Sequence, residues 1–326
     1  MLAGFACAVL TVATVGQVQA AGPHNVWKEV AAVTNSDGAY DTAAASGDTN
    51  GIIYFVGGSN GYYASTDVEG YNPTTNQWAS ITPMPEGMAS QATAAGLKGL
   101  LFSIGGLGPD DSNGAGVDTV YAYSPSRKAW ITEPPMPTAR YSLAAATGPD
   151  GRIYAIGGAN ATGVLNVVEA FNPTTATWST VAPLPIASAD LSAVTGPDGR
   201  IYAINWAMTP TGNGVVDAYD VYTNIWTPVA SVPMSEVECA AAASDGRIYA
   251  VESTVKAPKS ATATSPTFAY QASTNTWTKV ASMPWRWGAV CASLPTQPHI
   301  YAMGGASLEG YYPHPETTNT VLRYTA

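Results

Sequence analysis

The chain has 326 residues, of which 46% are hydrophobic, 11% are charged and 32 are glycine, a composition that excludes a disordered chain. Its formal net charge is -10 and no stretch gathers lysine or arginine, which argues against a nucleic-acid partner and against anionic membrane surfaces. We therefore expect a globular protein whose acidity mainly serves its solubility.

The first twenty residues form an apolar run that ends in Val18-Gln19-Ala20, a small-residue pattern suited to signal peptidase. They predict a signal peptide at 1–20, a secreted or periplasmic location, and no stable membrane insertion once the peptide is removed. The run lacks the basic residues that usually open a signal peptide, which leaves open a wrongly chosen start. A membrane anchor is a separate alternative, although the run is short for one. Residues 21–326 are expected to form one domain.

Three landmarks recur in register about every fifty residues along this domain. The first is tryptophan, at Trp27, Trp78, Trp130, Trp178, Trp226 and Trp277. Seven residues before all but the first of these lies another aromatic side chain, at Tyr71, Tyr123, Phe171, Tyr219 and Tyr270. A diglycine or its replacement follows each tryptophan, at 57–58, 105–106, 157–158, 205–206, 252–253 and 304–305.

Each unit is written as four short strands separated by turns. In the third unit they are "RYSLAAAT", "GRIYAIGG", "NVVEAFNP" and "ATWSTVAPLP", each bounded by Gly, Pro, Asn or Asp, and no unit holds a sustained helical stripe. Four strands per unit of about fifty residues is the period of a propeller blade. The diglycine with its spaced aromatic and tryptophan resembles the kelch repeat over nearly all of the chain from Trp27 onward. The resemblance implies an all-β fold of four-stranded kelch blades and is silent about activity.

The two ends of the chain complete one blade. The last diglycine is followed by Tyr324, but the chain ends before the tryptophan that should follow, whereas Trp27 begins a strand with no blade before it. We therefore predict a six-bladed β-propeller closed by the N-terminal strand, which leaves no free sheet edge. The tryptophans are expected to pack between blades rather than to bind ligands.

Cysteine and histidine give no clear metal site. Cys239 and Cys291 fall on the innermost strands of successive blades, where they either form a disulfide or act as small buried residues. The histidines, His24, His299 and His314, lie on different segments, which makes a copper site like that of galactose oxidase, another kelch propeller, a poor match. We expect no metal and no cofactor.

The resemblance to kelch propellers implies that a ligand binds at the mouth of the central channel. That mouth is formed by the loops that lead into the first strand of each blade and by the loops after the diglycine. Asn205-Trp206 and Glu252-Ser253 replace the diglycine there, which suggests that these side chains have a functional role. The residues predicted to bind a ligand are Tyr40, Asp41, Arg140, Tyr141, Asp190, Trp206, Glu238, Glu252, Arg286 and Trp287.

Two classes of function remain open. The first is a binding or interaction module, expected to be monomeric, that presents these loops to a protein or a glycan. The alternative, by resemblance to the periplasmic kelch propellers that interconvert sialic acid anomers, is a sugar-modifying enzyme of the mutarotase or epimerase type. Glu238 or Glu252 would then act as the acid and base, and Arg140 or Arg286 would bind the carboxylate.

A structural role explains the same residues. Both arginines are equally well placed to bond loop carbonyls, the glutamates to be solvated, and the tryptophans to pack between blades. The functional hypothesis is that six of the predicted residues converge on one face of the channel: Arg140, Trp206, Glu238, Glu252, Arg286 and Trp287.

Overall fold

The structure is a computed structural model that describes residues 25–34, 43–46, 50–59, 64–109, 114–208, 212–234, 236–252, 263–305 and 319–326. The predicted signal peptide at 1–20 lies outside these ranges. Within them the only helix is a 3-10 turn at Leu97–Gly99 (η1), and none is long and apolar enough to cross a bilayer.

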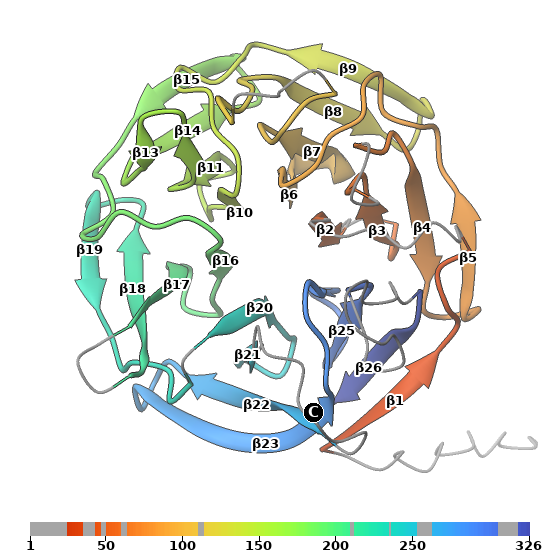
Figure 1. Cartoon of the computed structure of the whole chain (residues 1–326), viewed down its shortest axis with the longest axis vertical. Helices are drawn as coiled ribbons and strands as arrows, with labels where there is room; N and C mark the ends of the chain where they lie inside the picture. Colours follow the sequence, from red (N-terminus) through yellow and green to blue (C-terminus); the bar gives the residue numbers. More distant parts are fainter. Residues whose placement is uncertain are drawn as a thin grey trace, which may run out of the picture.

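Six four-stranded antiparallel sheets surround a central channel, as Figure 1 shows. Blade 1 contains β2 (Ala43–Ser46), β3 (Ile53–Val56), β4 (Val68–Asn72) and β5 (Gln77–Ser80). Blade 2 contains β6 (Ala92–Ala95), β7 (Leu101–Ile104), β8 (Val120–Ser124) and β9 (Ala129–Glu133). Blade 3 contains β10 (Ala144–Thr147), β11 (Ile153–Ile156), β14 (Val168–Asn172) and β15 (Thr177–Thr180). Blade 4 contains β16 (Ser192–Thr195), β17 (Ile201–Met208), β18 (Gly214–Asp220) and β19 (Ile225–Pro228). Blade 5 contains β20 (Val237–Ala242), β21 (Ile248–Glu252), β22 (Thr264–Gln271) and β23 (Thr276–Pro284). A two-stranded hairpin, β12 (Ala159–Asn160) and β13 (Gly163–Val164), follows the diglycine of blade 3.

Blade 6 joins the two ends of the chain. It contains β24 (Val290–Ser293), β25 (His299–Met303), β26 (Val321–Thr325) and, as its outermost strand, β1 (Val26–Val30). β1 pairs with β26 from Val26 opposite Thr325 to Val30 opposite Val321. The predicted six-bladed ring, closed by the N-terminal strand, is confirmed.

The repeated tryptophans form a ring of hydrogen bonds between blades. Each indole N–H donates to a backbone carbonyl in, or just after, the outer strand of the preceding blade. The Nε1–O distance is 2.8 Å from Trp78 to Ala31 and 2.9 Å from Trp226 to Ala182. Each tryptophan also packs against the aromatic on the third strand of its own blade, as in Tyr219–Trp226 with centroids 4.9 Å apart and Trp27–Tyr324 with centroids 5.4 Å apart. The tryptophans are therefore structural, as predicted.

A second aromatic contact crosses every interface. The aromatic of one blade's second strand meets the aromatic of the next blade's third strand, as with Tyr154 and Tyr219, whose centroids lie 5.6 Å apart, mostly edge to face. Buried aliphatic side chains fill the space around these pairs, so the core is divided into clusters that each span two blades.

In four of the six blades an asparagine stands shortly before the outer strand and bonds to the third-strand tyrosine. Asn76 has a positive φ of 54°, and its Oδ1 accepts hydrogen bonds from Tyr71 Oη at 2.8 Å and from the backbone N–H of Ala31 in the preceding blade at 3.0 Å. Asn25, Asn224 and Asn275 repeat this arrangement. Blade 3 is different, because Ala176 stands in place of the asparagine, with a positive φ of 53°, and Phe171 stands in place of the tyrosine. Neither residue there can form the bond.

The diglycines are required because the next blade lies against them. A Cβ atom on Gly157 would lie 2.4 Å from the carbonyl oxygen of Ser188, and one on Gly57 would lie 2.7 Å from that of Met88. Both glycines also have positive φ angles of 61°.

Because the strands of every blade run from the innermost to the outermost in the same order, the channel has two unlike faces. The diglycine face carries the glycines and the loops before the innermost strands, and the hairpin face carries the turns from innermost to second strand.

Candidate functional site

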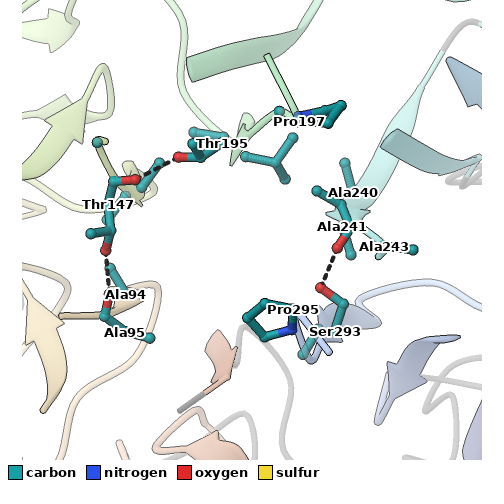
Figure 2. Close-up of a pocket in the computed structure, with 18 of the residues that line it drawn as sticks. Ala94, Ala95, Thr147, Thr195, Pro197, Ala240, Ala241, Ala243, Ser293 and Pro295 are labelled. Carbon is teal, nitrogen blue, oxygen red and sulfur yellow. Dashed lines mark hydrogen bonds between the residues drawn. The ribbon is translucent and has the colours of Figure 1, made fainter. Parts of the chain in front are cut away.

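The channel contains a cavity of about 640 Å³ that reaches the hairpin face. Small side chains line it because innermost strands from several blades converge there, and Figure 2 shows that alanine, threonine and proline dominate. The lining comes from blades 2 to 6 and comprises Thr93, Ala94, Ala95, Leu97, Ala145, Ala146, Thr147, Gly148, Pro149, Gly151, Ala193, Val194, Thr195, Gly196, Pro197, Ala240, Ala241, Ala242, Ala243, Ser244, Gly246, Cys291, Ala292, Ser293 and Pro295.

Hydroxyl groups tie the innermost strands of neighbouring blades together around this cavity. Thr195 Oγ1 donates to the carbonyl of Thr147 at 2.6 Å, and Ser293 Oγ donates to that of Ala242 at 2.6 Å. The hydroxyl of Thr147 in turn donates to the carbonyl of Ala95 (Figure 2). The cavity wall is therefore held in place by bonds between blades.

A disulfide adds a covalent link to the same wall. Cys239 on β20 and Cys291 on β24 are joined, with Cα atoms 5.3 Å apart. Of the two alternatives left open by the sequence, the structure has the disulfide, and it connects the innermost strands of blades 5 and 6 as the alignment of the repeats indicated.

The cavity lining suits binding rather than proton transfer. Among the described residues that line the cavity, none carries a side chain that titrates, since Cys291 is held in the disulfide. Thr93 is 8% exposed, and within the described chain its Oγ1 has no hydrogen-bond partner. Each innermost strand is also paired on one side only, so the other edge offers backbone N–H and C=O groups to the channel. A ligand would meet neutral hydrogen-bonding groups and small apolar surfaces.

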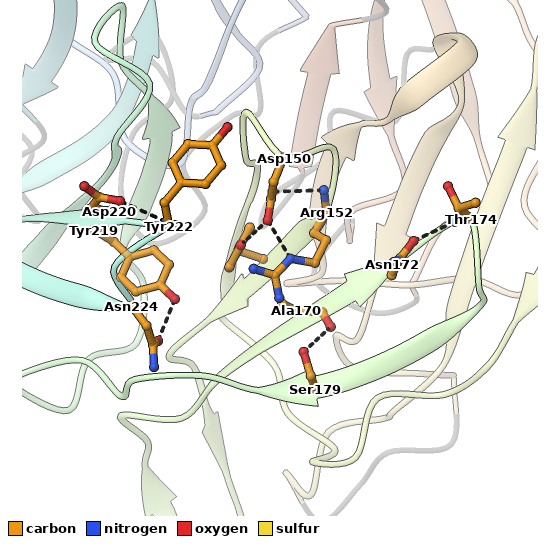
Figure 3. Close-up of polar contacts among 11 residues, drawn as sticks. Asp150, Arg152, Ala170, Asn172, Thr174, Ser179, Tyr219, Asp220, Tyr222 and Asn224 are labelled. Carbon is orange, nitrogen blue, oxygen red and sulfur yellow. Dashed lines mark hydrogen bonds and ion pairs between the residues drawn. The ribbon is translucent and has the colours of Figure 1, made fainter.

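The turns at the hairpin face explain the repeated "GPDGRIYA" of the sequence. In blade 3, Asp150 accepts a hydrogen bond from Arg152 Nε at 2.6 Å (Figure 3). It also accepts one from Tyr154 Oη at 2.8 Å, and the guanidinium of Arg152 lies over the Tyr154 ring. Burial acts to raise the pKa of Asp150, but the bonds from Arg152 and Tyr154 outweigh it and hold the pKa below its usual range. Burial and the neighbouring carboxylate raise the pKa of Tyr154. The motif therefore braces the channel rim.

The same brace occurs in two further blades. Asp198, Arg200 and Tyr202 form it in blade 4, and Asp245, Arg247 and Tyr249 form it in blade 5. Pro149, Pro197 and Gly246 of these three turns also line the cavity.

Arg140 lies at the diglycine face and is fully buried in its own blade. Its Nη1 is 2.6 Å from Glu169 Oε2, and its Nη2 donates to the carbonyl of Ala155 at 3.1 Å. Thr138 adds a hydroxyl bond to Glu169 at 2.8 Å. The guanidinium thus fixes the loop before β10 to strands β11 and β14.

Arg286 does the same in blade 6 without a carboxylate. It is 5% exposed, and its Nη1 donates to the carbonyls of Gly304 and Thr320, each at 3.0 Å. Burial lowers the pKa of Arg286 to about 10. Blades 3 and 6 lie across the ring from one another, so the structure does not bring the two arginines together (Figure 1).

The remaining predicted residues lie on the diglycine face or outside the description. Glu252 pairs in register with Val237, which brings it to the same end of blade 5 as Glu238, and both glutamates are half-buried. Trp287 of blade 6 is 37% exposed, and Asp190 of blade 4 is exposed. Tyr141 is half-buried and bridges to Ala159. Trp206 is on β17 and is described by its backbone, whereas Tyr40, Asp41 and Ser253 lie outside the described residues. None of the predicted residues whose side chains the structure describes lines the cavity.

A set of buried carboxylates was not anticipated. Glu69, Glu169 and Asp217 each stand two residues before the third-strand aromatic and are 5%, 2% and 3% exposed. The spacing of an acidic residue before Tyr71, Phe171 and Tyr219 was the available signal. Asn205, which the sequence did single out, is fully buried, and both polar atoms of its side chain lack a described partner. Among the described residues no group of three or more His, Cys, Asp and Glu could hold a metal ion.

Comparison with known proteins bears on this geometry. The family model of the Kelch motif matches residues 44–85, 88–137 and 140–185. Kelch-like protein 35 of Mus musculus is 34% identical over 134 residues, which are 41% of this chain and 22% of that protein. Beta-scruin of Limulus polyphemus is 34% identical over 113 residues, which are 33% of this chain and 12% of that protein. The chain thus spans less than a quarter of the length of these relatives.

A solved structure matches nearly the whole ring. It is described as "Structure of YjhT", with a TM-score of 0.71 and 16% identity, and the match covers 91% of this chain and 97% of that one. At that identity the likeness concerns the fold alone. The repeat landmarks, the six four-stranded blades and these matches agree, and the chain belongs to the kelch-repeat β-propellers.

Proposed function

We propose that the protein is an exported binding module that holds a segment of a protein ligand in its central channel. The observation that carries the proposal is the cavity of about 640 Å³, whose described lining residues have no titrating side chain. Its volume lies in the range of ligand sites, roughly 300–1,000 Å³. General acid–base chemistry needs a group that takes or gives a proton, and the residues described in this wall offer none.

The free edges of the innermost strands favour an extended polypeptide as the ligand. Six strands surround the channel, and each is paired on one side only. An extended segment can pair its own backbone with such an edge, the interaction known as β-strand addition. The part of the lining that the structure describes contains no aromatic side chain on which a sugar ring could stack, so a peptide fits the cavity better than a glycan does.

The family context supports a protein ligand. Kelch propellers commonly serve as protein-binding modules. This chain matches the Kelch motif and is similar in sequence to a kelch-like protein. A glycan ligand is the second possibility for the same site.

Export is supported by the disulfide. Cys239 and Cys291 are joined, and such bonds persist mainly in oxidising compartments. The apolar run at 1–20 points the same way.

The sugar-modifying enzyme is a second candidate, favoured by the placement of Glu238 and Glu252 at one end of blade 5. Against it stand the guanidiniums of Arg140 and Arg286, which are buried and bonded within their own blades, so a substrate carboxylate cannot reach them without opening those bonds. Exchange spectroscopy of sialic acid anomers decides this question. If the wild type accelerates the exchange between the anomers and the Glu238→Gln variant does not, the result would favour the enzyme over the binding module.

The binding proposal is tested by selecting peptides from a random display library on the wild type. Ala193→Trp places an indole in the cavity wall, and Thr180→Trp places the same side chain on the exposed outer strand β15 as the matched control. We expect peptides that bind the wild type and Thr180→Trp but lose at least tenfold in affinity for Ala193→Trp, with all three proteins melting alike. Peptides that bind all three equally would place the site outside the cavity.

A further inference from the structure

One buried carboxylate of the blade repeat lacks the partner that its equivalents have. Glu69, Glu169 and Asp217 occupy the same position of blades 1, 3 and 4, opposite Phe55, Ala155 and Ala203 in the register of the second strand. All three are more than nine-tenths buried. A carboxylate removed from water needs hydrogen-bond donors or a cation to offset the lost hydration.

Blades 1 and 3 supply these donors from the loop that precedes the innermost strand. In blade 1, Thr34 donates to Glu69 through its backbone N–H at 3.1 Å and through its hydroxyl at 2.7 Å. In blade 3, Arg140 and Thr138 donate to Glu169. Blade 6 places the guanidinium of Arg286 in the corresponding place against strand carbonyls. A cationic N–H donor therefore fits this position of the blade.

Blade 4 has Ser188 where blade 3 has Arg140. Two backbone bonds establish the equivalence: the carbonyl of Arg140 accepts from Gly106 N and that of Ser188 from Gly158 N, at 3.0 and 2.8 Å. The N–H groups of both residues donate to the preceding blade, to Val117 and to Leu165. Serine is too short to reach as arginine does. Within the described chain, Asp217 Oδ2 and Ser188 Oγ are both buried and unpartnered.

Asn205 adds polar groups beside the same place. It stands at the first diglycine position, where the carbonyl of Gly304 in blade 6 accepts from Arg286. Its side chain is fully buried, and neither Oδ1 nor Nδ2 has a described partner. Burial also raises the pKa of Asp217, as expected for a carboxylate held without a counter-charge.

We propose that blade 4 binds a guanidinium or primary ammonium group between Asp217 and Ser188, in the place that Arg140 fills in blade 3. The group is brought by a ligand, either as the side chain of an arginine or lysine in a protein or as a free small cation. This site lies at the diglycine face, apart from the channel cavity, and does not depend on the peptide-binding proposal.

Access and charge both favour such a ligand. Ser188 lies directly after the exposed loop residues 185–187, where Ile186 is 46% exposed and offers an apolar surface for the stem of a basic side chain. Asp190 is exposed on the same loop, and the whole chain carries a net charge of -10. A basic ligand is therefore drawn to this face.

Thermal unfolding with methylguanidinium chloride tests the site, with methylurea as the neutral match and KCl as the salt control. We expect a saturable rise in Tm of about 3 °C at twenty times Kd for methylguanidinium alone. The rise should vanish in Asp217→Asn and persist in Asp190→Asn, which removes an exposed acid of the same face. No rise in the wild type, or an equal rise in Asp217→Asn, would overturn the proposal.

Two further arms complete the experiment. Ser188→Arg should supply the cation from within, raise Tm and abolish the response to methylguanidinium; if that variant does not fold, Asp217→Asn alone decides. A blocked Gly-Arg-Gly peptide is compared with its citrulline counterpart to identify the source. Tighter binding of the arginine peptide than of methylguanidinium indicates a protein side chain, the reverse indicates a free small cation, and equal binding of the citrulline and arginine peptides would contradict the proposal.

Discussion

The indole of Trp27 donates a hydrogen bond to the carbonyl of Ala281, 254 positions later in the chain, at 2.9 Å. The bond runs from the outer strand of blade 6 to the outer strand of blade 5, and the other five tryptophans make its equivalent at their own interfaces. Closure of the ring therefore uses the same contact as every internal interface.

Replacing Trp27 by phenylalanine should lower the free energy of unfolding by about 1–3 kcal/mol, because a hydrogen bond is lost and part of the indole surface with it. Trp130→Phe is the matched control, since it removes the same bond between blades 1 and 2. Denaturant unfolding should give similar losses for both variants. A negligible loss for Trp27→Phe beside a clear loss for Trp130→Phe would show that the ring is not closed by β1.

Removing the charge of Arg140 should be far more damaging, because Glu169 would then be buried without its cation. We expect Arg140→Met to cost about 3–5 kcal/mol in unfolding free energy. The double variant Arg140→Met with Glu169→Leu should recover much of this loss, since neither charge then remains. A double variant less stable than the single one would contradict a dominant role for the ion pair.

Blade 3 contains a site at which stability can be increased. Ala176 adopts a positive φ, where the other blades have asparagine or lysine, so Ala176→Gly should stabilise the protein by about 1 kcal/mol. Ala176→Asn combined with Phe171→Tyr should stabilise the protein further, because it would give blade 3 the hydrogen bonds that Asn76 makes in blade 1. Asn76→Ala is the reverse control and should destabilise. Thermal unfolding that shows no gain for Ala176→Gly would contradict the assigned strain.

The braces at the hairpin face predict a dependence of stability on pH. The pKa values of Asp150 and Asp198 are lowered in the folded protein, where tyrosine and arginine donate to them and outweigh the effect of burial. Their contribution is therefore fully present above about pH 4, the usual pKa of aspartate, and is lost as pH falls through the lower folded values. The double variant Asp150→Asn with Asp198→Asn should lower Tm at pH 7 and lose part of the acid-induced fall in Tm. An unchanged difference between wild type and variant from pH 7 to pH 2 would contradict this.

The periodic landmarks predicted the fold because each one is a contact that every blade must make. Trp226, Tyr219 and the diglycines keep fixed spacings since they join neighbouring blades in the same way. The site was harder to predict. The sequence left Arg140 equally suited to a ligand and to a structural role, because its partner, Glu169, lies 29 residues away and only folding brings them together. The cavity escaped notice because its wall is alanine and threonine, residue types that carry no chemical signal in a sequence.

Methyl spectra of the protein labelled at alanine test the central claim, because the cavity wall is rich in alanine. On addition of a peptide selected by the wild type, we expect shifts at Ala94, Ala145, Ala193, Ala241 and Ala292, which line the cavity. The methyls of Ala129 and Ala176, on the outer strand of blade 2 and the outer turn of blade 3, should remain unchanged. Shifts confined to the outer alanines, with the cavity alanines unaffected, would contradict a ligand site in the channel.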